Sequence, residues 1–103
     1  MNQDLTVERK KDGTTLFVAP KGFINVMTAD IFGEALEDLE GIEKVIIDFK
    51  ETEYITSAGL RCMMAVLQYT DENGGEVIIR NADSEITEIL NMTGMVDLLV
   101  MEE

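Results

Sequence analysis

VIIDFKETEYITSAGLRCMMAVLQYT, residues 45–70, is the stretch that decides the fold. Its first five residues, 45–49, form a nearly continuous apolar run rich in β-branched side chains, which is typical of a central strand covered on both faces. Residues 50–55 are rich in charge and indicate a loop. From Ser57 to about Thr70 the apolar residues recur at helical spacing. The stretch therefore predicts a strand, a loop and a helix in succession.

Outward from this unit, strands and helices alternate along the chain. Asp12 and Gly13 favour a tight turn between two strands of period two, and Pro20 is expected to end the second of them. The other predicted elements are strands at 5–9 and 15–19, a helix at 28–39 capped by Thr28, a strand at 77–79, a helix that begins at Asp83 or Ser84, and an edge strand at 96–101. Strands joined through helices are parallel, with right-handed crossovers. We therefore expect one small α/β domain over residues 1–103, with a mixed sheet of about four to five strands and helices packed against it.

Charge is the strongest compositional signal. Twenty-one acidic and eight basic residues give a net charge of −13. Nucleic acids and anionic bilayers are bound through Lys and Arg, so neither is expected as a partner. The acidity either keeps a small protein soluble or attracts a partner with a basic face, and both readings stay open. Because residues 1–4 lack the features of a signal peptide and no apolar run could span a membrane, we expect a cytoplasmic protein.

Residue usage also restricts the chemistry. The chain has no His and a single Cys, Cys62, which excludes an intrachain disulfide, a thiolate zinc cluster and a Ser-His-Asp relay. We therefore expect neither an enzyme nor a cofactor. Asp48, Glu51 and Glu53 could bind a divalent metal, but a solvated acidic loop is the favoured reading. Cys62 is read as a packing residue rather than a redox group.

Ser57 occupies the position where the chemistry of such a fold is expected. It follows Phe49 by eight residues and begins the next helix, beyond the carboxyl end of the strand. On spacing alone Ser57 reads as a helix cap, with a phosphate acceptor as the second reading, because a helix N-terminus favours anions. Gly59 in the first turn allows another part of the chain to come close. Met63 and Met64 indicate a core stripe, with a partner contact as the alternative.

Several motifs, taken in order, resemble a known family. Residues 45–49 and 54–61 read as an apolar strand that ends near an Asp, then a short loop and a Ser followed by a small residue, Gly and Leu. Residues 22–29 match a segment before the first helix, residues 74–77 a Gly-Gly entry into a strand, and residues 92–95 a late turn. Together they resemble the STAS domain, specifically the bacterial anti-sigma factor antagonists.

The resemblance implies a switch in transcriptional control. Ser57 would be phosphorylated by a serine kinase that is itself the anti-sigma factor; the unphosphorylated domain would bind this kinase and release a sigma factor, and a serine phosphatase would reverse the modification. Asp48, Glu51 and Glu53 are close to Ser57 in sequence, so the phosphate is expected to meet existing negative charge. The partner interface that the resemblance implies comprises Asn25, Thr28, Thr56, Ser57, Ala58, Gly59, Leu60 and Arg61.

Two positions depart from the family pattern. Thr56 stands where many members carry Asp, and Ala58 stands where many carry a second hydroxyl, which leaves Ser57 the main acceptor and Thr56 a minor one. A STAS-like subunit that binds a partner in a transporter or sensor complex, without a phosphoswitch, is therefore kept as an alternative function. An enzyme that uses carboxylates or a metal is the weakest reading, because no acid and base are paired in separate motifs.

Overall fold

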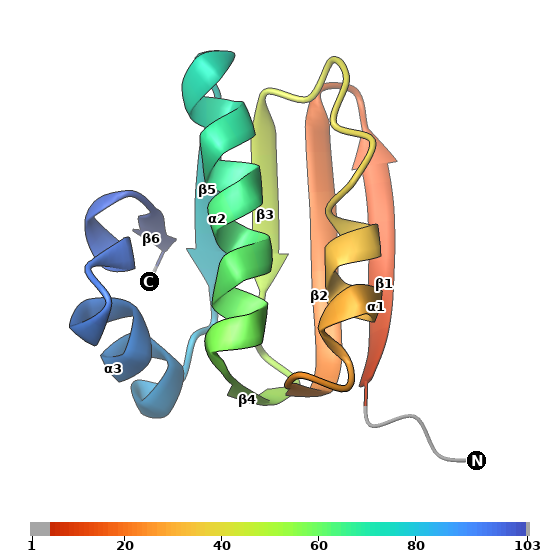
Figure 1. Cartoon of the computed structure of the whole chain (residues 1–103). Coiled ribbons are helices and arrows are strands. Elements are labelled where there is room, and N and C mark those ends of the chain that lie inside the picture. Colours follow the sequence, from red (N-terminus) through yellow and green to blue (C-terminus); the bar gives the residue numbers. More distant parts are fainter. Residues whose placement is uncertain (1–4, 103) are drawn as a thin grey trace.

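The computed structural model describes residues 5–102, so residues 1–4 and 103 of the predicted domain lie outside its range. After an opening hairpin, strands and helices alternate, except that two strands, β3 and β4, precede helix α2 (Figure 1). The elements are β1 (Leu5–Asp12), β2 (Thr15–Ile24), α1 (Ala29–Ala35), β3 (Lys44–Asp48), β4 (Thr52–Ile55), α2 (Ser57–Glu72), β5 (Glu76–Arg80), α3 (Ser84–Met92), the 3-10 helix η1 (Met95–Asp97) and β6 (Val100–Glu102).

The strands form one mixed sheet in the order β1-β2-β3-β5-β6. β1 and β2 are an antiparallel hairpin, whereas β3 pairs in parallel with both β2 and β5, and β6 pairs in parallel with β5. β4 lies off this path and pairs in parallel with the end of β2, which brings the described sheet to six strands. The predicted mixed α/β fold is confirmed, with one strand more than the four to five expected.

Helices α1 and α2 lie against the same face of the sheet (Figure 1). The steps from β2 to β3, from β3 to β5 and from β5 to β6 all advance across the sheet in one direction. Right-handed crossovers that advance in one direction keep their helices on one side. The prediction that residues 45–49 are covered on both faces is therefore wrong: Val45 and Ile47 are fully buried, but Ile46 between them is only half-buried on the opposite face.

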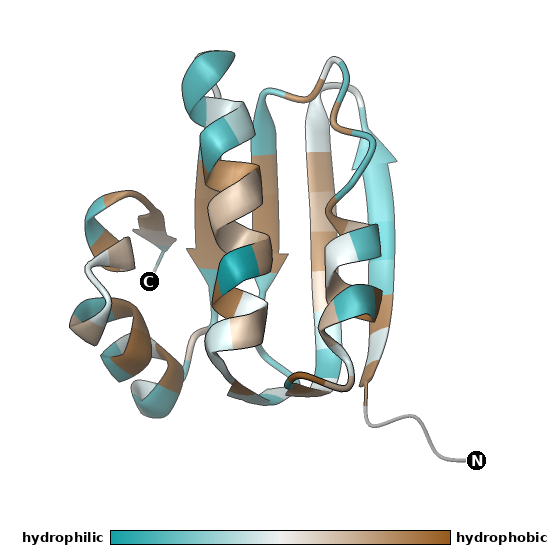
Figure 2. Cartoon of the chain, viewed as in Figure 1, coloured by the Kyte–Doolittle hydropathy of each residue, from teal (hydrophilic) through white to brown (hydrophobic). Residues whose placement is uncertain are grey.

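The core fills the space between this face and the helices. Apolar segments of β3 and β5 run behind α2, whereas β1 at the edge of the sheet is mostly hydrophilic (Figure 2). Side chains from every α-helix reach zero exposure in this core, as do side chains from the strands; among them are Phe32, Met63, Leu90, Val18, Ile47 and Ile79. One continuous cluster of this kind is what holds a domain of this size together.

Strand β2 passes through Pro20 instead of ending there. Its pairing with β3 ends at Val18 and its pairing with β4 begins at Gly22, so Pro20 lies between its two parallel partners. The Pro20 carbonyl accepts a 2.8 Å hydrogen bond from Thr52 Oγ1 in β4. Because N–H and C=O of one residue in a strand point to the same side, the missing N–H of Pro20 faces the gap where no ladder bond is needed. This gap also explains why residues 50–55 form a short strand rather than only a loop.

Two other elements are shorter than predicted. Helix α1 ends at Ala35 rather than near residue 39, and Arg9 of β1 donates hydrogen bonds of 2.9 Å to the Ala35 carbonyl and 2.8 Å to the Glu37 carbonyl. These bonds satisfy carbonyl groups that a longer helix would have used. β6 begins at Val100 rather than at residue 96, because Gly94, with φ of 77°, starts the turn of η1 first.

Candidate functional site

Ser57 is the first residue of helix α2, and its side chain is exposed. The chain enters this helix from β4, whose Ile55 pairs with Ile24 at the end of β2. Thr56 N–H then donates a 2.9 Å hydrogen bond to the Ile24 carbonyl. This pairing places the segment that follows β2, beginning with Asn25, directly beside the start of α2. The structure thus brings Asn25 close to Ser57.

Ser57 is not the helix cap. The N-cap position belongs to Thr56, and neither a side-chain capping bond nor an acidic residue is present in the first turn of α2. The N–H groups of a first helical turn have no partners within the helix, and the positive end of the macrodipole lies at the same place. By contrast, α3 has a conventional cap, because the Asp83 carboxylate accepts a 2.9 Å hydrogen bond from Ile86 N–H. The start of α2 is therefore an open position for an anion beside an exposed hydroxyl.

The hydroxyl of Thr56 has a different environment from that of Ser57. Thr56 Oγ1 is buried and has no hydrogen-bond partner. A buried hydroxyl without a partner carries a desolvation cost of about 1–3 kcal/mol. Of the two neighbouring hydroxyls, only that of Ser57 is accessible to another molecule in this structure.

The segment from Asn25 to Thr28 is a tight turn that exposes two apolar side chains. Thr28 is buried, and its Oγ1 donates a 2.7 Å hydrogen bond to the Phe23 carbonyl and accepts a 2.9 Å bond from Asn25 N–H. The Asn25 side-chain carbonyl accepts a 2.9 Å bond from Met27 N–H. The side chains of Val26 and Met27, between these anchors, are 80% and 83% exposed. Thr28 occupies the N-cap position of α1 as predicted but makes no capping bond, because its hydroxyl serves this turn instead.

The exposed pair Val26 and Met27 was missed by sequence reasoning. Two further large apolar side chains nearby in the fold, Phe23 of β2 and Tyr54 of β4, are each 42% exposed on strands that pair with each other. The available signal was the pair of apolar residues between Asn25 and Thr28, two polar residues that commonly form turns. Phe23 and Tyr54 point to the face of the sheet opposite α2, because their strand neighbours Ile24 and Ile55 contact the start of that helix. We therefore call Val26 and Met27 the apolar rim of the site.

The other predicted interface residues divide between surface and interior. Arg61 is exposed and lies one turn after Ser57 on the same side of α2, whereas Gly59 and Leu60 are buried and Ala58 is half-buried. A Cβ atom at Gly59 would lie 2.5 Å from Ile24 Cγ2 and 2.7 Å from Ile55 Cγ1. Gly59 therefore allows the first turn of α2 to sit close against β2 and β4, as its position suggested.

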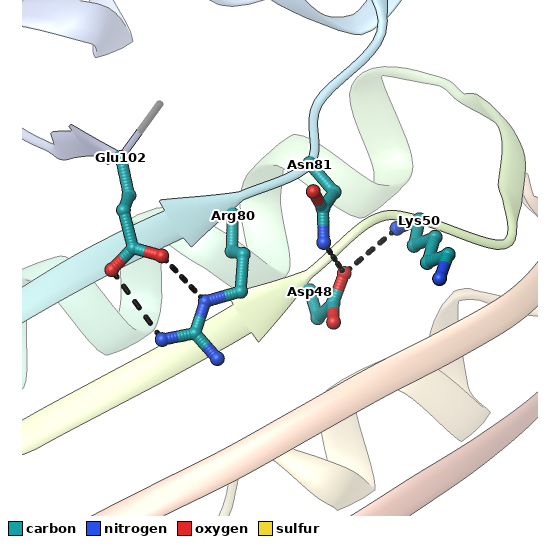
Figure 3. Close-up of polar contacts among 5 residues, drawn as sticks. All are labelled: Asp48, Lys50, Arg80, Asn81 and Glu102. Atoms are coloured by element: carbon teal, nitrogen blue, oxygen red, sulfur yellow. Dashed lines mark hydrogen bonds and ion pairs between the residues drawn. The ribbon is translucent and has the colours of Figure 1, made fainter.

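Of the three acidic residues before the site, Asp48 and Glu51 form contacts of their own, and Glu53 is exposed. Asp48 Oδ1 accepts hydrogen bonds of 2.9 Å from Lys50 N–H and 3.0 Å from Asn81 Nδ2 (Figure 3). Glu51 forms an exposed ion pair of 3.6 Å with Lys21. Within residues 5–102, no group of three His, Cys, Asp or Glu side chains is arranged to hold a metal ion.

A second ion pair lies beside Asp48 at the carboxyl ends of the strands. Arg80 of β5 donates hydrogen bonds to both carboxylate oxygens of Glu102 in β6, and the distance from Arg80 Nε to Glu102 Oε1 is 2.6 Å (Figure 3). The hydrogen bond from Arg80 holds the pKa of the Glu102 carboxyl below its ordinary value, and the same bond raises the pKa of Arg80. This ion pair connects β6 to β5 in addition to their backbone pairing.

Cys62 and Met63 face the interior of the fold. Cys62 Sγ lies 3.4 Å from the Ala29 carbonyl of α1 and 3.5 Å from the Ala58 carbonyl, and burial raises the pKa of its thiol, with the charge of Asp30 adding to the shift. A raised pKa keeps the sulfur protonated and unreactive. Met63 is fully buried and belongs to the core, whereas Met64 is 46% exposed and is available for contact with a partner.

In residues 5–102 no helix combines the length and the apolar character that crossing a bilayer requires.

Comparison with known proteins identifies the family to which the chain belongs. The family model of the STAS domain matches residues 6–103. No curated protein sequence matches the chain.

Among solved structures, the fold is similar to those of anti-sigma factor antagonists. The protein from Mycobacterium paratuberculosis superposes with a TM-score of 0.79 at 19% identity, covering 94% of this chain and 84% of that chain. Unphosphorylated SpoIIAA gives a TM-score of 0.78 at 10% identity, covering 95% of this chain and 88% of that chain. The phosphorylated form of Bacillus SpoIIAA gives 0.75 at 10% identity, with 95% and 92% covered. At these identities the likeness is one of fold, and together with the family match over nearly the whole chain it shows that this protein belongs to the STAS domain family.

Proposed function

We propose that this chain is an anti-sigma factor antagonist that is switched by phosphorylation of Ser57. In its unphosphorylated form it binds an anti-sigma factor serine kinase and so releases a sigma factor. The observation that carries the proposal is the exposed Ser57 hydroxyl at an uncapped helix N-terminus that lacks acidic residues. Its structural relatives support the assignment, since one of them is known in both unphosphorylated and phosphorylated forms.

The apolar rim supplies the contact surface in this proposal. Val26 and Met27 are more than three-quarters exposed and lie on the turn that follows Ile24, whose carbonyl accepts the bond from Thr56 N–H at the entry of α2. Burying such side chains against a partner stabilises a complex by about 25 cal/mol for each Å² of apolar surface removed from water. A kinase that docks on the rim therefore covers Ser57 at the same time, which joins binding and phosphorylation at one surface.

Phosphorylation changes this surface in a defined way. The Ser57 oxygen forms a bond to the γ-phosphorus of ATP, the bond from that phosphorus to the β-phosphate bridging oxygen breaks, ADP leaves, and the hydroxyl proton passes to a base of the kinase. The product carries about −1.5 to −2 charges at pH 7. In the free protein this charge is stabilised by the N–H groups of α2 and by Arg61 one turn away.

The same charge is unfavourable in the complex. Returning phosphoserine to an interface lined by apolar side chains removes its water without supplying new partners, which costs a few kcal/mol. A cost of about 3 kcal/mol corresponds to a loss of affinity of roughly 10²-fold. The modified protein releases the kinase, and a serine phosphatase restores binding. We place these events in the cytoplasm, where the kinase finds ATP, and the net charge of −13 argues against nucleic acid or an anionic membrane as the partner.

The modification is tested by incubating the protein with the serine-kinase anti-sigma factors of its host and ATP, and then locating any phosphate by mass spectrometry. We expect one phosphate at Ser57. Ser84 is the matched internal control, because it is also exposed and also begins a helix, but its helix is capped by Asp83. Phosphate at Ser84, or at neither serine with any of these kinases, contradicts the phosphoswitch.

The effect on binding is tested by calorimetry with the same kinase. We expect Ser57→Asp to weaken binding at least tenfold, because it adds a charge at the proposed interface, and Ser57→Ala and Ser84→Asp to bind like the unmodified protein. Equal affinities for Ser57→Asp and Ser84→Asp would refute the electrostatic mechanism.

Thr56, in place of the usual Asp, favours a second candidate function. A STAS subunit that binds its partner permanently, in a transporter or sensor complex, needs no acceptor at position 57. This function predicts stable complexes that are insensitive to Ser57→Asp, and no phosphate on the purified protein. The two experiments above therefore distinguish the candidates.

A further inference from the structure

A groove of about 680 Å³ runs along helix α2, away from Ser57, and is half-open to solvent. Its base includes the buried side chains of Leu67 and Val77. Its sides carry Met64 of α2 and Leu98, which follows η1, and these two large apolar side chains are 46% and 59% exposed. Arg61 lies at the end nearest Ser57, so the groove begins where the proposed phosphorylation site ends.

The shape of the groove favours an elongated occupant over a small molecule. On the α2 side the groove extends from Arg61 to Asp71, ten residues further along the helix, which is about 15 Å at a rise of 1.5 Å per residue. Small-molecule sites bury roughly 70–90% of the ligand surface, whereas a half-open groove covers one side of its occupant only. An amphipathic helix of about three turns presents one apolar side of this length.

The charge of the groove selects among possible helices. Asp71 and Glu76 line its far end, and Arg61 is the one basic residue among the side chains that line it. The chain as a whole carries a net charge of −13, which opposes the approach of a second copy and attracts a basic partner. Met64 adds an unbranched, polarizable side chain of the kind that adapts to apolar surfaces of different shape.

We propose that this groove binds a basic amphipathic helix of a partner protein. The apolar stripe of that helix covers Met64 and Leu98, and Lys or Arg side chains beside the stripe pair with Asp71 and Glu76. Arg61 borders both this groove and Ser57, but the residues on which the proposal depends, Met64, Leu98, Asp71 and Glu76, lie away from Ser57, so the proposal does not require its phosphorylation.

The probe is a synthetic peptide of about 14 residues with Leu at helical spacing and Lys on the flanks of the Leu stripe. Its controls are a scrambled peptide of the same composition and a peptide with Glu in place of Lys. Titrations into the full chain are followed by amide chemical shifts. We expect saturable binding of the amphipathic Lys peptide, with the shifted amides centred on residues 64–71 and on Leu98, and with affinity that falls as salt is raised.

Variants of the exposed side chains locate the binding. Leu98→Asp and Met64→Asp are each expected to weaken binding at least about tenfold, and neither changes a buried position. Met92→Asp is the matched control, because Met92 is 78% exposed and does not line the groove. The proposal is overturned by no binding at millimolar peptide, by equal binding of the Lys and Glu peptides, or by shifts centred on the apolar rim.

Discussion

Replacing Thr28 by valine tests whether the turn that presents the apolar rim depends on one buried hydroxyl. Valine keeps the shape of the side chain but removes the oxygen. That oxygen donates at 2.7 Å to the Phe23 carbonyl and accepts at 2.9 Å from Asn25 N–H, and Thr28 is only 5% exposed. Both backbone groups would then lie beside a methyl group in a part-buried position.

The magnitude follows from the number of bonds lost. A typical intramolecular hydrogen bond contributes about 0.5–1.5 kcal/mol net, and a buried group left without a partner costs about 1–3 kcal/mol. Two lost bonds with partial access of water to the Asn25 segment predict a loss of about 2–3 kcal/mol in the free energy of unfolding. For a domain of this size each kcal/mol lowers Tm by about 4–8 °C, so we expect a shift of roughly 10–20 °C.

Thr56→Val is the matched control, because Thr56 also occupies the N-cap position of a helix and also makes no capping bond. Its Oγ1 is buried and unpaired, so valine removes an unsatisfied polar atom rather than a hydrogen bond. Substituting an N-cap threonine usually costs about 0.5–2 kcal/mol, but that contribution is absent here. We expect Thr56→Val to leave the free energy of unfolding unchanged or to raise it by up to about 1 kcal/mol.

The assay is urea unfolding followed by far-UV circular dichroism, with the m-value checked for constancy between variants. Equal losses of stability for Thr28→Val and Thr56→Val would refute the reasoning, as would a loss of more than about 1 kcal/mol for Thr56→Val alone.

Three further predictions concern packing and titration. Gly59→Ala should lower the free energy of unfolding by about 1–3 kcal/mol, because the added Cβ would press against side chains of the sheet. Gly33→Ala should change the free energy of unfolding by less than about 1 kcal/mol in the same urea assay, since its Cβ would lie 3.3 Å from the movable Cys62 sulfur. By NMR the pKa of Glu102 should lie below the ordinary value of a glutamate, so its contribution to stability is present above the unfolded pKa and is lost as pH falls through the folded pKa. Arg80→Gln should return that pKa to the ordinary range. Because the folded pKa of Cys62 is raised, stability should fall as pH rises above about 8.5 in the wild type and fall less in Cys62→Ala.

Much of the fold could be predicted from local patterns, because those patterns report how the larger elements are buried. The start of α2 at Ser57 and the cap of α3 at Asp83 follow from apolar spacing and capping chemistry, which act over a few residues. β4 could not be predicted in this way. It pairs through residues 52–55 with β2 alone, across a register shift, so its existence depends on where β2 continues past Pro20.

The position of the candidate site could be predicted from the sequence, but the apolar side chains exposed around it could not. Ser57 and its neighbours were found from the helix start and the family motifs. Val26 and Met27 were missed because an apolar residue is expected inside, and only the bonds of Thr28 and Asn25 within the turn direct these two side chains outward. Leu98 was read as part of an edge strand, and its exposure follows from the turn of η1. Such exposure depends on tertiary contacts, which local sequence patterns do not report.

The double pairing of β2 has a consequence for how the protein meets a partner. One strand is bonded to β1, to β3 and, at its end, to β4, and its last residue, Ile24, accepts the hydrogen bond from Thr56 N–H at the entry of α2. The turn that follows Ile24 is closed by its own hydrogen bonds. The positions of the apolar rim and of Ser57 relative to each other are therefore fixed before a partner binds. Little conformational entropy remains to be lost on association, so complexes at this surface should form without rearrangement, and their lifetimes rather than their rates of formation should respond to substitutions.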